Sequence, residues 1–200
     1  MAITKRCIVS LRASGTIAAE TANNITSTST GTLSADLVDE DGGATGASLS
    51  CAHSNRTTDS GGGRSAGATT LDQQINAQGV YCHTAAQSGA PHEYTVTLPA
   101  SHDNVRVRVY ACTTYAGNED LDVTVNGVTQ NINATTNTTG AYLDWPDVTP
   151  SSDQITISAV NGAYPGSFYV YLNGFIIEPV SSGPSSSTLL ATLIANEFTI

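Results

Sequence analysis

Charged side chains are scarce in this 200-residue chain, in which Asp, Glu, Lys and Arg together make up 12% of the residues. Seven Lys and Arg residues stand against seventeen Asp and Glu residues, which gives a formal net charge of -10. A surface of this sign repels phosphate backbones and anionic lipid headgroups. We therefore expect neither a nucleic-acid-binding protein nor a membrane-binding protein.

The chain also lacks the spacings of metal, redox and export motifs. None of the four cysteines, Cys7, Cys51, Cys82 and Cys112, lies in a CxxC pair, so we interpret them as small, buried and reduced. No segment is long and apolar enough to cross a bilayer. Met1 leads directly into polar residues without an apolar stretch that ends in a cleavage site. We therefore expect synthesis in a cytoplasm, without secretion.

Signals of catalysis are equally sparse. The four histidines, at positions 53, 83, 92 and 102, show no metal-ligand spacing, and each is explained as a surface or hydrogen-bonded side chain. Ser60 lies in a Gly-rich stretch, but no motif places a histidine beside it. We therefore predict that the chain is not an enzyme and that it needs no cofactor.

What the chain does contain is alternation of apolar and polar residues. Three such runs, 94–98, 105–109 and 121–125, predict strands with one buried and one solvated face. Asn126-Gly127 is a strong hairpin signal because both residues tolerate positive φ. The sequence thus predicts an antiparallel meander at the centre of the chain.

Further strands are predicted on both sides of this centre. Arg6 to Arg12 is a first strand or an arm that pairs with a neighbour, and Leu71 to Gln78 provides one or two helical turns or a bridging segment. Phe168 to Ile177 reads as one long last strand with a bulge at Asn173-Gly174. Other short strands are predicted at 33–38, 47–51, 80–82, 128–132, 142–145 and 155–159.

The two ends differ from the middle in composition. Residues 181–187 (SSGPSSS) have the composition of a linker, and residues 189–200 (LLATLIANEFTI) are apolar enough to require a partner. This tail either folds back as an added strand or docks on another subunit. We divide the chain into an arm and polar connection (1–30), a β-sandwich (31–180), and a linker with an apolar tail (181–200).

The order of the strand patterns resembles the galactose-binding-like β-sandwich domains. About nine strands at this spacing predict an all-β, antiparallel sandwich of jelly-roll type, with an extended N-terminal arm and a C-terminal tail. Such domains occur in secreted polysaccharide-acting proteins and in bacteriophage virion proteins. The resemblance rests on these segments: LVDEDGGATGASLSCA (37–52), EYTVTLP (93–99), VRVYA (107–111), LDVTVNGVTQ (121–130), DQITISA (153–159) and YVYLNGFIIEP (169–179).

The resemblance implies sugar binding at loops through exposed aromatic residues, and frequently a structural calcium ion. The candidate carbohydrate-binding residues are Tyr115, Asn118, Tyr164 and Trp145. The two tyrosines equally suit capping of the sandwich ends, and Trp145, at a strand end before Pro146, suits core or rim packing. The candidate calcium ligands are Asp39 and Asp41 in an acidic turn, which otherwise is simply solvated.

Two functions follow as hypotheses. The first is a bacteriophage virion structural protein on the particle surface, either a capsid decoration subunit or a small tail component, whose partners are other virion proteins and copies of itself. The alternative is a carbohydrate-binding module for glycan or host-surface attachment. For the first function, we expect subunit contacts from Arg6, Ile8, Val9, Leu11, Leu189, Leu190, Leu193, Ile194 and Phe198.

Overall fold

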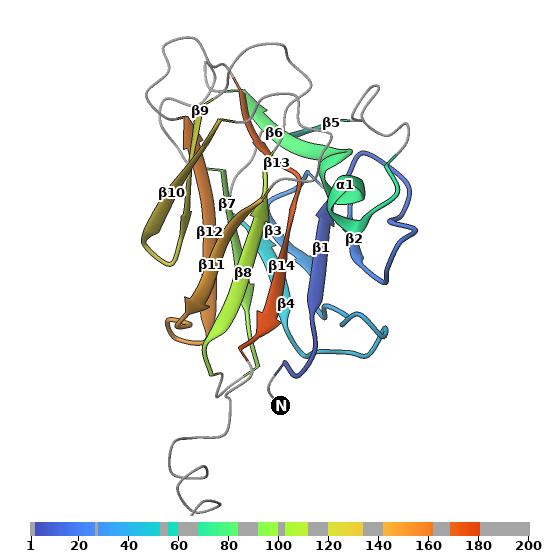
Figure 1. Cartoon of the computed structure of the whole chain (residues 1–200), viewed down its shortest axis with the longest axis vertical. Coiled ribbons are helices and arrows are strands. Elements are labelled where there is room, and N and C mark those ends of the chain that lie inside the picture. Colours follow the sequence, from blue (N-terminus) through green and yellow to red (C-terminus); the bar gives the residue numbers. More distant parts are fainter. Residues whose placement is uncertain are drawn as a thin grey trace, which may run out of the picture.

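Two β-sheets packed face to face form the body of the protein in a computed structural model (Figure 1). The structure describes residues 3–26, 28–52, 56–59, 68–83, 92–99, 103–111, 120–133, 142–161 and 169–180. Inward-facing side chains of both sheets form one apolar core. The predicted all-β antiparallel sandwich is confirmed, and its jelly-roll winding stays a prediction.

Sheet A has five strands and sheet B has six. In spatial order, sheet A contains β11 (Leu143–Val148), β8 (Val105–Tyr110), β14 (Gly174–Pro179), β1 (Cys7–Leu11) and β2 (Asn23–Ile25). Sheet B contains β10 (Val128–Asn133), β9 (Asp120–Val125), β12 (Gln154–Asn161), β7 (His92–Thr97), β4 (Ser48–Cys51) and β3 (Gly31–Ser34). A smaller sheet contains β13 (Tyr169–Leu172), β6 (Gly79–His83) and β5 (Arg56–Asp59).

The period of two in the sequence produces the core directly. In β8, Val105, Val107 and Val109 are buried between the sheets, whereas Arg106 and Arg108 on the other face are partly exposed. Tyr94 and Val96 of β7 meet them from sheet B as part of the same cluster. Burying a side chain of this size stabilises the fold by about 1.5–3 kcal/mol.

Two of the cysteines are buried in the core like the apolar residues. Cys7 and Cys51 are both buried in the core, as predicted, and Cys7 is an unbridged thiol. Burial raises the pKa of Cys7 to about 12, so this thiol is not ionised near neutral pH. Cys82 and Cys112 have side chains outside the part of the chain that the structure describes.

The Asn-Gly hairpin is present. Asn126 (φ 43°) and Gly127 (φ 84°) form the two-residue turn between β9 and β10, with Val125 opposite Val128. The Asn126 side chain also fastens this turn to the neighbouring β12: its oxygen accepts the Thr156 N–H at 2.7 Å, and its amide donates to Thr149 O at 2.9 Å. One side chain therefore joins three segments.

The predicted central meander is wrong beyond that hairpin. β7 and β9 both pair with β12 rather than with each other or with β8. β8 lies in the opposite sheet, between β11 and β14. Alternation specifies which face of a strand is buried, but it carries no information on which strand lies beside it.

The N-terminal segment is an interior strand, not an arm. β1 lies between β14 (antiparallel) and β2 (parallel), and Ile8, Val9 and Leu11 are fully buried. These three side chains pack within the chain, so they offer no surface to a second subunit. The sandwich therefore includes residues before position 31, which the sequence assigned to an arm and a connection.

The predicted long last strand is two strands in different sheets. β13 pairs with β6 in the small sheet, and β14 pairs with β1 and β8 in sheet A. Asn173 makes the change of sheet: it is buried, and its amide donates to Gln78 O at 2.7 Å and Asn76 O at 3.3 Å. The expected bulge is thus a switch point between sheets.

The predicted helical turns are present as α1 (Leu71–Asn76), which begins with a capping box between Thr70 and Gln73. The helix lies beside β2 and the upper part of β1 (Figure 1). There Ile75 packs with Ile8, Ile176 and Tyr110 in a second apolar cluster. Among the described residues, no helix is long and apolar enough to span a membrane.

A substitution at Gly174 tests how tightly β14 packs against β1, next to the point where the chain changes sheet. A Cβ at this position would lie 2.3 Å from the Val9 carbonyl oxygen and 2.8 Å from Ile75 Cγ2. We expect Gly174→Ala to lower the free energy of unfolding by about 2 kcal/mol or more, because β14 must move away from β1. Urea denaturation measures this.

The control is Gly15→Ala, where φ is positive but the space around the Cβ is open. It should cost only about 1 kcal/mol, the penalty for a left-handed backbone. Equal losses in the two variants would contradict the close approach of β14 to β1.

Candidate functional site

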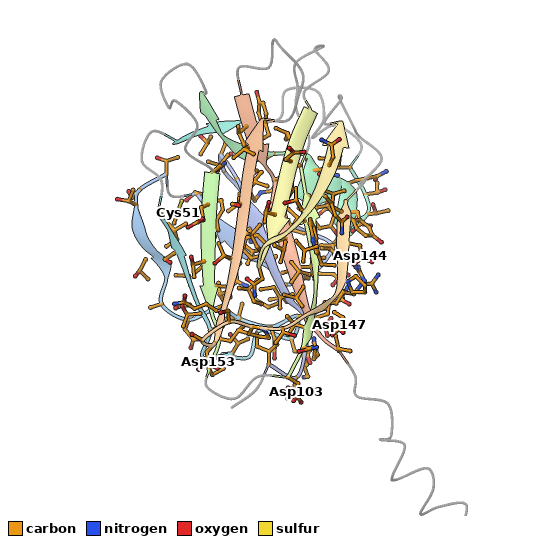
Figure 2. All side chains as sticks on the ribbon, turned by 90° about the vertical axis from the view of Figure 1, so that its left-hand side faces the viewer. Cys51, Asp103, Asp144, Asp147 and Asp153 are labelled. Atoms are coloured by element: carbon orange, nitrogen blue, oxygen red, sulfur yellow. The ribbon has the colours of Figure 1, made fainter. Side chains whose placement is uncertain are left out.

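A pocket of about 420 Å³ lies where the edges of the two sheets face each other. Its walls come from the β9–β10 hairpin of sheet B and from β11 and the residues after it in sheet A. Figure 2 shows the molecule from this side, with Asp144 and Asp147 on β11. The lining residues are Val125, Asn126, Val128, Gln130, Trp145, Pro146, Asp147, Val148 and Thr149.

Two side-chain hydrogen bonds connect the sheet edges beside the pocket. The Trp145 indole N–H donates to the Val128 carbonyl oxygen at 3.0 Å, and the Gln130 amide donates to the Asp144 carbonyl oxygen at 2.7 Å. Each links β11 to β10, strands that belong to different sheets. The pocket is therefore held by fixed walls on both sides.

Trp145 is 4% exposed, so most of its ring packs into the core while the remainder lines the pocket. The structure thus shows the core packing that the sequence left open for Trp145, whereas its part in carbohydrate binding stays a prediction. Because its N–H is already bonded to Val128, the indole offers a ligand only its apolar surface. This suits contact with the C–H face of a bound ring.

Polar groups form the rim. Asp147 is exposed, and its carboxylate accepts a hydrogen bond from the Asn104 amide at 2.6 Å. Thr149 and Gln130 complete the rim, and Asn126 is occupied in holding the hairpin. Among the described residues that line this pocket, none is Lys or Arg. Its electrostatic character is therefore neutral to negative.

The outer face of sheet A next to the pocket carries paired charges. Arg106 donates two hydrogen bonds to Asp144, at 2.8 and 2.7 Å, and Arg108 pairs with Glu178 at 2.9 Å. The Arg108 guanidinium also lies 5.3 Å from the centre of the Tyr142 ring. Both strand arginines therefore have acidic partners within the chain.

Only one of the predicted carbohydrate-binding residues lies in the described structure. Tyr115, Asn118 and Tyr164 fall outside the described residues, and Trp145 lies in the pocket. Sequence reasoning missed Gln130 and Asp147, since neither has a distinctive local pattern. The only available signal was their position in the sequence. Gln130 lies before Trp145 and Asp147 after it, and each is close to turn residues.

The predicted calcium ligands have other partners. One Asp39 oxygen accepts the backbone N–H groups of Asp41 and Gly43, at 2.9 and 2.8 Å, and Asp41 pairs with Lys5. In the described ranges, no group of three His, Cys, Asp or Glu side chains is placed to hold a metal ion. The structure thus explains this acidic turn by internal bonds.

Arg6, a predicted subunit contact, is also engaged within the chain. Its guanidinium donates to Glu40 at 2.7 Å and to Glu20 at 2.5 Å. The remaining predicted contacts, from Leu189 to Phe198, fall outside the described residues. Their role in assembly stays a prediction.

Comparisons with known proteins find similar structures but identify no family for this chain. The sequence matches no protein-family model and no curated protein. Among solved structures, protein YXIM from Bacillus subtilis matches with a TM-score of 0.51 and 17% identity, over 90% of this chain and 41% of that chain. A chain in the complex of plant peptide RALF23 with FER and LLG2 matches with a TM-score of 0.51 and 12% identity, over 94% of this chain and 44% of that chain.

Carbohydrate-binding module domains are also among the matches. One is the CBM36-1 domain of a multidomain xylanase from the hindgut metagenome of Trinervitermes trinervoides, at a TM-score of 0.36 and 16% identity, over 62% of this chain and 96% of that domain. That score is too low to carry an argument. Our chain spans about two fifths of the two chains that match better. These two likenesses show a shared β-sandwich fold.

The Arg106–Asp144 pair beside the pocket predicts a pH-dependent contribution to stability. The hydrogen bonds from Arg106 lower the pKa of Asp144 in the folded protein. A carboxyl whose folded pKa is depressed stabilises the fold above its unfolded pKa, about 3.9, and loses that contribution as pH falls through the folded pKa. We expect Asp144→Asn to be less stable than the parent at pH 7.

Since both side chains are about one-third exposed, the difference should stay below about 1 kcal/mol. It should shrink progressively as the pH falls below about 4. Denaturant unfolding of both proteins across this range measures it, with Asp103→Asn, an exposed carboxylate, as control. A stability difference that does not change with pH would contradict the role of the ion pair.

Proposed function

We propose that this chain is a non-catalytic β-sandwich module that binds a neutral glycan in the pocket between β10 and β11. The observation that carries the proposal is the composition of the walls. Trp145 and Pro146 of β11 and Val128 of β10 supply apolar surface from both walls, and Gln130, Asp147 and Thr149 supply hydrogen-bonding groups. A sugar ring has the same division, with C–H groups on its faces and hydroxyls around its edge.

The size and rigidity of the pocket support this proposal. About 420 Å³ falls within the range of about 300–1,000 Å³ for small-molecule sites. The hydrogen bonds of Trp145 and Gln130 fix the two walls before any ligand arrives. A preformed site does not spend binding free energy on ordering its side chains.

The charge of the pocket lining limits which sugars can bind. In the described part of the chain, the pocket lining contains one carboxylate, Asp147, and no cationic residue, and the whole chain carries a net charge of -10. Uronic and sialic acid sugars would meet repulsion here. We therefore assign neutral sugars, with Asp147 and Gln130 as acceptors for hydroxyl groups.

The lining also supports binding without hydrolysis. Glycosidases use two carboxyl groups on opposite sides of the scissile bond, about 5–10 Å apart. Asp147 is the single acid among the described residues that line this pocket, and the Asp144 carboxylate is bonded to Arg106 on the outer face. The proposed role is thus attachment.

The virion role expected from the sequence stays a prediction that is compatible with attachment. A surface subunit of a particle that also binds glycans would combine both hypotheses. Its partners, its copy number and its place on the particle are open to direct measurement on particles.

Substitutions at the pocket test the proposal. A glycan array identifies a neutral oligosaccharide, and isothermal titration then measures its affinity. We expect Asp147→Ala and Gln130→Ala each to weaken binding about tenfold or more, the effect of about 1.4 kcal/mol for a lost hydrogen bond to a ligand.

Asp153→Ala is the matched control, because Asp153 lies at the same end of the sandwich but not among the pocket residues (Figure 2). It should leave the affinity unchanged. Thermal unfolding of each variant separates lost binding from lost folding. Unchanged affinity in folded Asp147→Ala and Gln130→Ala proteins would remove the pocket as the site.

A further inference from the structure

A bulge in β11 determines which of its side chains reach the pocket. Between Trp145 and Val148, β11 contains one residue more than its partner β8. In a regular strand, residues three apart point to opposite faces, whereas here both side chains are buried in the core. The two residues between them, Pro146 and Asp147, are exposed and line the pocket. The bulge thus presents a carboxylate on the same wall as the Trp145 ring.

The charge of this carboxylate is not compensated by the part of the chain that the structure describes. Asp147 accepts a hydrogen bond at 2.6 Å from the Asn104 side chain, which is a neutral amide. By contrast, Asp144 on the same strand pairs with Arg106 at 2.7 Å. A carboxylate without a counter-ion attracts cations from solution. Asp147 therefore gives the pocket a local negative charge.

The opposite wall offers a second acceptor. Gln130 is the register partner of Val123, which is fully buried, so the Gln130 side chain lies on the inward face of β10. Its amide nitrogen donates to the Asp144 carbonyl oxygen at 2.7 Å. Because a carbonyl oxygen only accepts, Gln130 Oε1 is left as an acceptor. Among the described residues, no group donates to this oxygen.

The side-chain N–H donors in the lining are directed at the protein itself. The Asn126 amide donates to the carbonyl oxygens of Thr149 and Gln154, at 2.9 and 3.3 Å. The Trp145 indole N–H donates to the Val128 carbonyl oxygen. The Asp147 carboxylate and Gln130 Oε1, in contrast, can still accept hydrogen bonds from a ligand. The pocket therefore favours a ligand that is rich in donors and carries positive charge.

A primary ammonium group has both properties. It carries three N–H donors and no acceptor, whereas a hydroxyl group carries one donor and no charge. Hydrogen bonds between an ammonium group and a carboxylate are roughly twice as strong as those between neutral groups. An indole ring such as that of Trp145 also attracts a cation. An ammonium group thus suits this lining better than a hydroxyl group does.

We propose that the pocket also binds cationic amino sugars, and that Asp147 makes it prefer a protonated amino group to a hydroxyl group. The inference rests on the proposed function, because it concerns the same pocket, and it extends the ligand class from neutral to cationic sugars. Asp147 is exposed, so water and salt screen the attraction. The preference is therefore about three- to tenfold in affinity.

Isothermal titration of the full chain with three β-1,4-linked tetrasaccharides tests this preference. They differ only at carbon 2 of each ring: cellotetraose has a hydroxyl group, the glucosamine tetramer an ammonium group, and the N-acetylglucosamine tetramer an uncharged amide. We expect the glucosamine tetramer to bind about three- to tenfold more tightly than cellotetraose. N-acetylation should remove this gain, and raising the salt from about 0.1 M to about 1 M should reduce it.

Two variants separate a contact in the pocket from general attraction to an acidic chain. Asp147→Asn keeps the shape of the side chain but removes its charge, so the affinity ratio of the glucosamine tetramer to cellotetraose should fall to about one. Asp153→Asn removes the same charge at the same end of the sandwich, outside the pocket lining (Figure 2). This control should leave the ratio unchanged.

A ratio near one in the parent protein would overturn the inference, and so would a ratio that Asp147→Asn leaves unchanged. Failure of the glucosamine tetramer to bind would overturn it as well. Cellotetraose binding without any preference would refute only this inference and leave the glycan proposal standing. Asp147-dependent binding of the glucosamine tetramer, with no binding of any neutral sugar, would support the inference and contradict the assignment of neutral sugars.

Discussion

The burial of inward-facing side chains between sheets A and B is the constraint on which the rest of the structure depends. Strands β1, β8 and β14 place every second residue in this layer, from Val9 in β1 to Ile177 in β14. The layer is complete in the middle of the sandwich and ends at β10 and β11. The pocket and the exposed Val128 are both consequences of where it ends.

Side-chain hydrogen bonds compensate for this open edge. Trp145 and Gln130 join the sheets there, and Asn126 holds the hairpin against β12. Buried polar groups with partners fix one arrangement of a core and do not merely add to its stability. A site built between two sheets needs such fixation, because edge strands otherwise have neighbours on only one side.

The sequence predicts faces and turns better than neighbours. Asn126-Gly127 identified its hairpin because the backbone conformation there is a local property. The pairing of β7 and β9 with β12 is not local, so alternation could not reveal it. The run of β1 (CIVSL) is buried on both faces because Ile75 of α1 packs on its outer side, and a search for alternation misses such a strand.

The candidate site was predicted only in part, for the same physical reason. Trp145 is conspicuous as the single tryptophan, whereas Gln130 and Asp147 become neighbours only when strands from different sheets meet at their edges. Asn173-Gly174 shows that the prediction of the fold is limited in the same way. A polar residue and a glycine within an apolar run suggested a bulge, and the contacts with Asn76 and Gln78 that make it a switch lie far away in sequence.

The fluorescence of Trp145 reports directly on sugar binding in the pocket, since Trp145 is the only tryptophan and it lines the pocket. During titration with a neutral oligosaccharide that binds the full chain, we expect a saturable change in its emission, with the same midpoint as calorimetry. Binding by calorimetry without any change in Trp145 emission would place the sugar elsewhere and contradict binding in this pocket.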